Sequence, residues 1–227
     1  DASFQFRAGE VVGFSGLVGA GRTEVVRAII GADPRTGGKV FLNGKPLNCR
    51  TPHDAIVNGV VMVPEDRKLQ GIIPRMSVGR NISIGSLDQI TNRLGFVNTR
   101  REEQIGLEGK ANFNIKTPDL EKPIVELSGG NQQKAIVARW MSTKPEVLIL
   151  DEPTKGIDVG AKSEFYNMIC EFAKEGLAVI LISSELPEVI GLSDRIIVMR
   201  GRRIVGEISA KDATEEKLLS MAMMEET

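Results

Sequence analysis

The sequence is short of the residue types that build metal centres and disulfide scaffolds. It holds one histidine, His53, and two cysteines, Cys49 and Cys170, which lie far apart in the chain. The cysteines do not have metal-ligand spacing, so we expect free thiols in a reducing compartment. Without a second histidine, His53 is expected to be a surface residue rather than a ligand or a base.

Excess charge of one sign and long apolar runs are also missing. The 29 Lys and Arg residues nearly balance the 30 Asp and Glu residues, which leaves no basic footprint for nucleic acid or a membrane surface. No apolar run is long enough to span a bilayer, and no signal peptide is recognisable. The 227 residues can bury a proper core. Because the first residue is Asp rather than Met, we expect the chain to begin inside a longer polypeptide.

What the sequence does contain is a glycine-rich loop between a predicted strand and a predicted helix. The apolar run at 11–14 predicts a buried strand, and apolar residues recur at helical spacing from Val25 to Ile30. Between them, residues 15–24 read Ser-Gly-Leu-Val-Gly-Ala-Gly-Arg-Thr-Glu. Glycines let successive N–H groups turn inward, and the helix N-terminus adds partial positive charge. This context favours phosphate binding.

The glycine-rich loop departs from the phosphate-binding P-loop pattern at one position. Gly16 and Gly21 have the P-loop spacing, and Thr23 falls where a hydroxyl would bind Mg²⁺. The lysine expected after Gly21 is Arg22, which keeps the charge but is larger and forked. Taken alone, the loop is open to two interpretations, nucleotide binding or a plain glycine-rich turn.

The remaining pattern predicts a mostly helical lobe inserted into an α/β core. Asn43-Gly44 between two short strands is typical of a hairpin. From about 66 to 140 the pattern is mostly helical, with Thr51, Ser77 and the pair Thr99 and Glu102 as predicted helix caps in and before this stretch. The core lobe then comprises 1–65 and 141–227. Further strands are expected at 59–64, 147–150, 178–182, 196–199 and 204–208.

Polar residues follow three of the predicted strands, at 65–68, 151–152 and 183–184. Open α/β sheets bind ligands at the carboxyl ends of their strands. We therefore expect Asp151 to be an Mg²⁺ ligand and Glu152 to polarise an attacking water. The alternatives are a solvated turn at 65–68 and a capped strand end with exposed acids at 151–152.

A second glycine motif, Leu-Ser-Gly-Gly-Asn-Gln-Gln-Lys, occupies residues 127–134 and leads into a helix that ends near Met141. Two glycines beside Ser128 at a helix N-terminus can bind an anion by the same logic as the first loop. The alternative is a glycine-rich helix start without a ligand.

In this order and at these separations, the motifs resemble those of an ATP-binding-cassette (ABC) domain over essentially the whole chain. The stretches Gly-Leu-Val-Gly-Ala-Gly-Arg-Thr-Glu, Val-Pro-Glu-Asp-Arg-Lys and Ile-Ser-Ser-Glu-Leu-Pro-Glu-Val are similar to the C-terminal cassette of tandem ATPase subunits. Those subunits energise bacterial importers of ribose, arabinose, xylose and galactose. The resemblance implies one cassette over 1–227, with a P-loop NTPase core, an N-terminal antiparallel β portion and an inserted helical subdomain. The N-terminal cassette is then missing from this chain.

The resemblance also implies a head-to-tail pair in which each ATP lies between the P-loop of one cassette and the Leu-Ser-Gly-Gly motif of the other. Mg²⁺ would bind Thr23 and Asp151, and the catalytic positions are Glu152, Glu65 and Ser184. The implied nucleotide contacts are Gly16, Leu17, Val18, Gly19, Ala20, Gly21, Arg22, Thr23 and Glu24 on one face, and Ser128, Gly129, Gly130 and Asp158 on the other.

Departures from the family pattern gather on the P-loop face. Arg22 replaces a lysine, Glu65 replaces the glutamine of Mg²⁺ and water sensing, and Ser184 replaces the histidine that contacts the γ-phosphate. A carboxylate facing phosphate would repel it, and serine is shorter and cannot be cationic. No Tyr or Trp precedes Arg22 to stack on adenine. We therefore expect a competent Leu-Ser-Gly-Gly face, and a P-loop face that binds nucleotide weakly and hydrolyses it slowly or not at all.

The implied partners are the N-terminal cassette of the same polypeptide, transmembrane permease subunits contacted near 66–90, and indirectly a periplasmic sugar-binding protein. The chain would then act at the cytoplasmic face of the inner membrane, without nucleic acid, and would be a weak or inactive ATPase alone. One alternative is a catalytically silent half that only completes the partner's ATP site. Another is a soluble cassette ATPase acting on DNA or ribosomes, against which the neutral charge argues.

Overall fold

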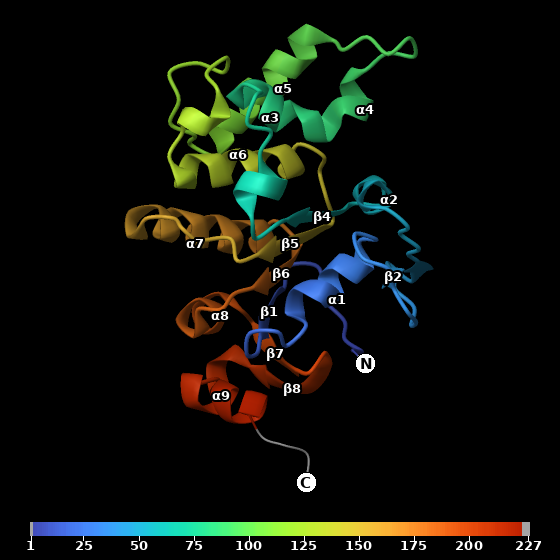
Figure 1. The fold of residues 1–227 in the computed structure, drawn as a ribbon, viewed down its shortest axis with the longest axis vertical. Coiled ribbons are helices and arrows are strands. Elements are labelled where there is room, and N and C mark those ends of the chain that lie inside the picture. The colour runs from blue at the N-terminus through green and yellow to red at the C-terminus, as the bar shows by residue number, and fades with distance from the viewer. Residues whose placement is uncertain (1, 224–227) are drawn as a thin grey trace. The chain divides into compact units, whose positions relative to one another are not determined.

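The computed structural model describes residues 2–223, an α/β chain that contains one six-stranded sheet (Figure 1). Residues 1 and 224–227 of the predicted cassette lie outside the described residues. The strand order across the sheet is β4-β5-β6-β1-β7-β8. The strands are β1 (Val11–Ser15), β4 (Val60–Val63), β5 (Val147–Asp151), β6 (Ala178–Ile182), β7 (Arg195–Arg200) and β8 (Arg203–Ser209).

The pairing of these strands brings three chain segments to one edge of the sheet. Strand β1 is parallel to both β6 and β7, and β5 is parallel to β6, whereas β8 closes the sheet as an antiparallel neighbour of β7. Register aligns Asp151 with Ile182, and Ile182 with Phe14. The segments that follow β1, β5 and β6 therefore leave the sheet at the same edge, where parallel sheets bind their ligands.

The core of the sheet explains why the apolar runs of the sequence form strands. All residues of β1, β5 and β6 are buried, which is typical of parallel strands covered on both faces. The first helix packs on one face through Val26, which is fully buried together with Phe14 and Ile149. The ring of Phe4 lies edge-on to that of Phe14, with 5.3 Å between centroids. The predicted α/β core is confirmed.

Nine α-helices and four short helical turns are found within residues 2–223, and helical residues make up most of the chain between β4 and β5. The α-helices are α1 (Arg22–Ile29), α2 (Pro52–Val57), α3 (Val78–Ser83), α4 (Leu87–Ile90), α5 (Thr99–Asn112), α6 (Gly129–Met141), α7 (Val159–Lys174), α8 (Leu186–Leu192) and α9 (Glu215–Met223). Short 3₁₀ turns cover Ile84–Ser86, Ile124–Glu126 and Ala210–Asp212, and a π-helical turn covers Arg67–Gly71. Within residues 2–223, no helix is long and apolar enough to cross a membrane.

The predicted hairpin is confirmed as β2 (Phe41–Leu42) and β3 (Lys45–Pro46), which pair antiparallel. Its two turn residues, Asn43 and Gly44, both have positive φ, at 50° and 76°. Two successive positive φ values define the type I′ turn that matches strand twist, and Asn-Gly is the sequence that tolerates it best.

Helix caps follow the sequence closely, with one shift. Thr51 accepts a hydrogen bond from the Asp54 N–H in a reciprocal capping box, and Ser77 accepts one from the Arg80 N–H. Helix α5 begins at Thr99, the predicted cap, but its capping residue is Asn98, whose Oδ1 accepts from the Arg101 N–H at 3.1 Å. An Asn side chain caps a helix at least as well as Thr, so the adjacent asparagine takes the position.

The chain divides into two compact units. The sheet unit comprises Asp1–Met62, Glu146–Glu152 and Tyr166–Thr227, and the helical unit comprises Val63–Pro145 and Pro153–Phe165. The sequence places 153–165 in the core lobe, whereas the structure groups this segment with the helical unit. The reason is local, because the turn at 155–156 and the start of α7 contact the start of α6.

Candidate functional site

The glycine-rich loop has a backbone that only glycine fits at two positions. Gly16 and Gly21 have φ values of 152° and 98°. A Cβ on Gly16 would lie 2.3 Å from the carbonyl oxygen of Met199, and one on Gly21 would lie 2.9 Å from Cγ of Arg202. Gly19, by contrast, would direct a Cβ into open space, and Val18 beside it is 96% exposed. The loop is thus anchored at both ends and open at its crest, as a phosphate cradle requires.

At the end of this loop, Thr23 meets Asp151. The Thr23 Oγ1 hydroxyl donates a hydrogen bond to Asp151 Oδ1 over 3.1 Å, and Asp151 is 1% exposed at the end of β5. A hydroxyl oxygen and a carboxylate oxygen side by side are ligands that Mg²⁺ prefers, usually with phosphate oxygens and water completing the shell. In residues 2–223 no group of three or more His, Cys, Asp or Glu side chains could hold a metal alone. The donor set therefore fits Mg²⁺ bound jointly with a phosphate ligand.

Glu152 adopts a backbone conformation that is uncommon for its residue type. Its φ is 47°, in the left-handed region, while its N–H still donates to the Ile182 carbonyl over 2.8 Å. Its Oε2 atom accepts a hydrogen bond from the Ser184 hydroxyl over 3.0 Å. Non-glycine residues in this region cost free energy and cluster at functional sites. With this backbone conformation the chain turns away from the direction of β5, and the Glu152 carboxylate contacts Ser184 in the segment after β6.

Arg22 lies beside the same carboxylate. Its Nη1 donates to the Ser183 carbonyl over 2.7 Å, and its Nη2 lies 4.0 Å from Glu152 Oε1. The side chains of Arg22 and Glu152 are only 11% and 12% exposed. The guanidinium is therefore engaged with residues at the end of β6.

A second group of predicted site residues lies in the helical unit, at the start of α6. Ser128 is the capping residue, but its side chain makes no capping hydrogen bond, and its Oγ accepts instead from Asn131 Nδ2 over 2.9 Å. Asp158 Oδ1 accepts from the Ala161 N–H over 2.9 Å and so caps α7. The first N–H groups of α6 are left free of the Ser128 hydroxyl, which suits them to an anion.

Glu65 also lies in the helical unit, and its charge is compensated there. Lys155 Nζ lies 2.6 Å from Glu65 Oε1 in an exposed ion pair. From the sequence, the Glu65 carboxylate is expected to repel a phosphate. An exposed ion pair is weak and screened by solvent, so this expectation stays a prediction.

The structure thus gathers the predicted residues into two groups. The loop 16–24, Asp151, Glu152 and Ser184 converge in the sheet unit, while Glu65, Ser128–Gly130 and Asp158 belong to the helical unit. Two residues in the second group were not predicted, Arg67 and Lys155. Arg67 belongs to the polar run after β4, and Lys155 follows the Asp-Glu-Pro-Thr run. Arg67 donates to the Lys155 carbonyl, and the Lys155 ammonium group pairs with Glu65, but neither contact leaves a signal in the local sequence.

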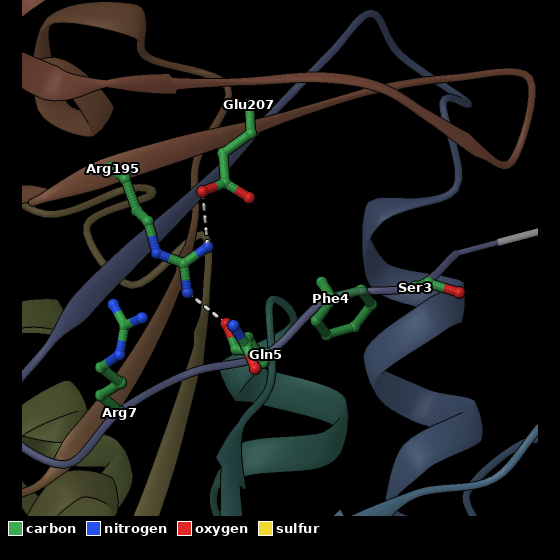
Figure 2. A pocket seen from close by; sticks show the side chains of 6 residues that line it. All are labelled: Ser3, Phe4, Gln5, Arg7, Arg195 and Glu207. Atoms are coloured by element: carbon green, nitrogen blue, oxygen red, sulfur yellow. Dashed lines mark hydrogen bonds and ion pairs between the residues drawn. The ribbon is translucent and has the colours of Figure 1, made fainter.

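A cavity of about 430 Å³ lies elsewhere in the sheet unit. Figure 2 shows the side chains that line it. One lining residue is Arg195, which pairs with Glu207 over 3.1 Å and with Glu10 over 2.6 Å, and which donates to the Gln5 carbonyl. Burial raises the pKa of Glu10, but hydrogen bonds from Arg195 and from the Arg7 N–H outweigh it and lower the pKa overall. Two carboxylates, Glu10 and Glu207, already pair with Arg195 and offset its charge. The lining of the cavity consists of Ser3, Phe4, Gln5, Arg7, Arg195 and Glu207.

The sequence of this chain matches those of known proteins. The profile of the family described as ABC transporter matches residues 1–155. The arabinose import ATP-binding protein AraG of Mannheimia succiniciproducens is 54% identical over 226 residues, which cover 99% of this chain and 45% of that protein. The ribose import ATP-binding protein RbsA 3 of Rubrobacter xylanophilus is 47% identical over 222 residues, 98% of this chain and 44% of that protein. The chain spans about half the length of the curated relatives it matches.

Solved structures agree on the fold. A nucleotide-free ATP-binding cassette from an ABC transporter superposes with a TM-score of 0.80 at 20% identity, covering 99% of this chain and 92% of that one. The cbiO1 protein of Clostridium perfringens, part of an ABC transporter complex, gives 0.77 at 23% identity, over 95% of this chain and 83% of that one. The α/β fold with a small antiparallel sheet and a helical subdomain is confirmed, and the chain belongs to the ABC transporter family.

Proposed function

We propose that this chain is the ATP-binding cassette of a bacterial monosaccharide importer. The observation that carries the proposal is the convergence of Thr23, Asp151 and Glu152 on the glycine-rich loop. It occurs in a chain 54% identical to a protein named for arabinose import. The loop and the start of α1 bind the phosphates of ATP, and Thr23 and Asp151 hold Mg²⁺. When bound, Mg²⁺ supplies positive charge that offsets the negative charge developing on the phosphate oxygens.

On the P-loop side, we propose weak nucleotide binding and slow or absent hydrolysis. Arg22 must release the Ser183 carbonyl and leave Glu152 before it can reach a phosphate. The Ser184 hydroxyl donates a hydrogen bond to the Glu152 carboxylate. A serine side chain also brings no positive charge to a γ-phosphate. Two of the three departures thus act on Glu152, the residue proposed to polarise the attacking water.

On the other face, Ser128, Gly129, Gly130 and Asp158 complete the ATP site of a partner cassette. The uncapped start of α6 supports this role. The length of the relatives, about twice that of this chain, leaves room for a second cassette in the same polypeptide. A related fold has been solved as a dimer, the post-hydrolysis state of an ATP-binding cassette bound to ADP and Pi.

The remaining partners follow from the same proposal. The chain acts at the cytoplasmic face of the inner membrane, contacts permease subunits through the segment near 66–90, and serves a periplasmic sugar-binding protein indirectly. A second candidate is a catalytically silent half that contributes only the Ser128 face. The engagement of Arg22 with Ser183 and Glu152 favours this variant of the proposal.

The proposal is tested by two assays. In proteoliposomes containing the full-length protein and its permease, ATP should drive uptake of a pentose or hexose, and ATP turnover without uptake of any monosaccharide would contradict the transport function. In solution, this chain alone should show a flat, near-zero rate as its concentration rises, with activity appearing when the partner cassette is added. A rate per mole that climbs with concentration would show instead that its own P-loop site works.

Restoring the family residues at the three departures should raise hydrolysis at this P-loop. We expect the full-length variant Arg22→Lys, Glu65→Gln, Ser184→His to gain at least about tenfold in the turnover contributed by this site, since even one group of this kind contributes that much in related chemistry. The measurement is ATPase activity in a background where the partner cassette's catalytic glutamate is replaced by glutamine. An unchanged rate would show that the three residues do not limit this site.

A further inference from the structure

Arg67 fastens two segments of the helical unit that are far apart in sequence. Its Nη1 donates to the Lys155 carbonyl over 2.7 Å, and its Nη2 donates to the Gly156 carbonyl over 2.9 Å. Bonds from a charged guanidinium are about twice as strong as neutral ones, and the planar fork fixes the direction of both acceptors. The Arg67 side chain therefore holds the turn at 155–156 through the backbone carbonyls of the turn.

The same guanidinium lies against the start of α6. A Cβ on Gly129 would lie 2.7 Å from Arg67 Nη2 and 3.1 Å from the Gly156 carbonyl oxygen. The close approach of these groups is possible only because residue 129 lacks a side chain. Arg67 is thus packed between the glycines of the Ser128 motif and the turn that leads to Asp158.

Neighbouring residues hold Arg67 in this place. Asp66 Oδ1 accepts hydrogen bonds from the Lys68 and Leu69 N–H groups, both over 3.0 Å, and so fixes the start of the π-helical turn. Glu65 binds the Lys155 ammonium group over 2.6 Å. Lys155 is consequently held at its side chain by Glu65 and at its carbonyl by Arg67.

We infer that Arg67 is a positioning residue that fixes the Ser128–Gly130 start of α6 and the 155–158 turn in one arrangement. The inference rests on the proposed function, since Ser128, Gly129, Gly130 and Asp158 are the groups offered to the partner cassette's ATP. Arg67 touches no nucleotide in this account. Its loss lowers the rate at the completed site while the glycine-rich loop keeps its own affinity.

The test compares Arg67→Ala and Arg67→Lys with the unmodified full-length protein, and uses Arg93→Ala, an exposed arginine of the same unit, as the control. The first measurement is amide hydrogen exchange, which reports local opening without any need for ATP turnover. For Arg67→Ala we expect exchange to become at least tenfold faster at 132–134, where the N–H groups of α6 begin to bond within the helix, and at 156–158, with residues 16–23 unchanged. Lysine, which cannot fork to two carbonyls, should restore protection only in part.

The second measurement separates KM from kcat for ATP. Arg67→Ala should lower kcat about tenfold and change KM less than twofold, and unchanged amide exchange at 16–23 in the same variant shows that general unfolding is not the cause. Unchanged exchange at either segment, or unchanged kcat, would overturn the inference. If the unmodified protein shows no ATP turnover, the proposed function fails, and the exchange result alone then supports or overturns the positioning role.

Gly129→Ala provides an independent variant that leaves Arg67 in place. Its added methyl group should displace the guanidinium and produce the same faster exchange at 156–158. Residues that act through one contact give non-additive effects, so the double variant Arg67→Ala, Gly129→Ala should exchange no faster at 156–158 than the more affected single variant. Fully additive effects would contradict a shared contact.

Discussion

A full-length protein carrying Ser128→Asp is expected to hydrolyse ATP about 100-fold more slowly than the unmodified protein, the scale seen when one stabilising group facing a reacting centre is lost. Ser128 is exposed at the start of α6, where the account places a phosphate of the partner cassette's ATP. Aspartate is a good helix cap, so the fold is kept while a negative charge is set against the phosphate.

The matched control for Ser128→Asp is Asn98→Asp. It adds the same charge at the cap of α5 in the same unit, where the side chain keeps its acceptor oxygen for the Arg101 N–H. The control should retain turnover within about twofold, in line with the small effects of surface substitutions. Turnover by Ser128→Asp that matches the control would show that this face does not meet the nucleotide.

The second large effect is expected from Arg139→Ala, which should lower the free energy of unfolding by about 3 kcal/mol. Arg139 is 6% exposed on α6, and burial lowers its pKa to about 10, so it stays charged at neutral pH. Its guanidinium donates to the Asn81 carbonyl and the Gly71 carbonyl, each over 2.6 Å, and to Asn81 Oδ1 over 2.9 Å. Truncation removes a charged donor from both carbonyls, leaves Asn81 Oδ1 with the Ile73 N–H alone, and opens a cavity.

Urea denaturation of the full-length protein followed by circular dichroism measures this loss. Arg100→Ala, an exposed arginine on α5, is the control and should change the free energy of unfolding by less than about 0.5 kcal/mol. Equal stability of Arg139→Ala and Arg100→Ala would show that the buried guanidinium is not required to hold the segment before α3.

Much of the fold was readable from local sequence because the relevant forces are local. The apolar runs at 147–150 and 178–182 form buried parallel strands, and Asn43-Gly44 forms the tight turn that its two residues favour. The meeting of Thr23 with Asp151 was also predictable, since both follow strands that end at one edge of the sheet.

Other parts of the site depend on side chains that meet across long stretches of chain. The ion pair of Glu65 with Lys155 and the hydrogen bonds of Arg67 join positions that are close only after the loops fold. The contact of Arg22 with the Ser183 carbonyl involves a backbone acceptor, which carries no residue-type signal. Sequence singled out positions 22 and 65 as departures from the family pattern, but it could not predict which groups they contact.

The central claim is that this chain contributes its Ser128 face to catalysis and that its own Glu152 contributes little. The most direct test is the kcat for ATP of the full-length protein carrying Glu152→Gln, a substitution that keeps the side-chain shape and an oxygen for the Ser184 hydroxyl. We expect at least about half of the turnover to remain, because the partner's P-loop is proposed to perform most of the hydrolysis. A loss of more than about tenfold would contradict it and show that the P-loop of this chain is a main catalytic site.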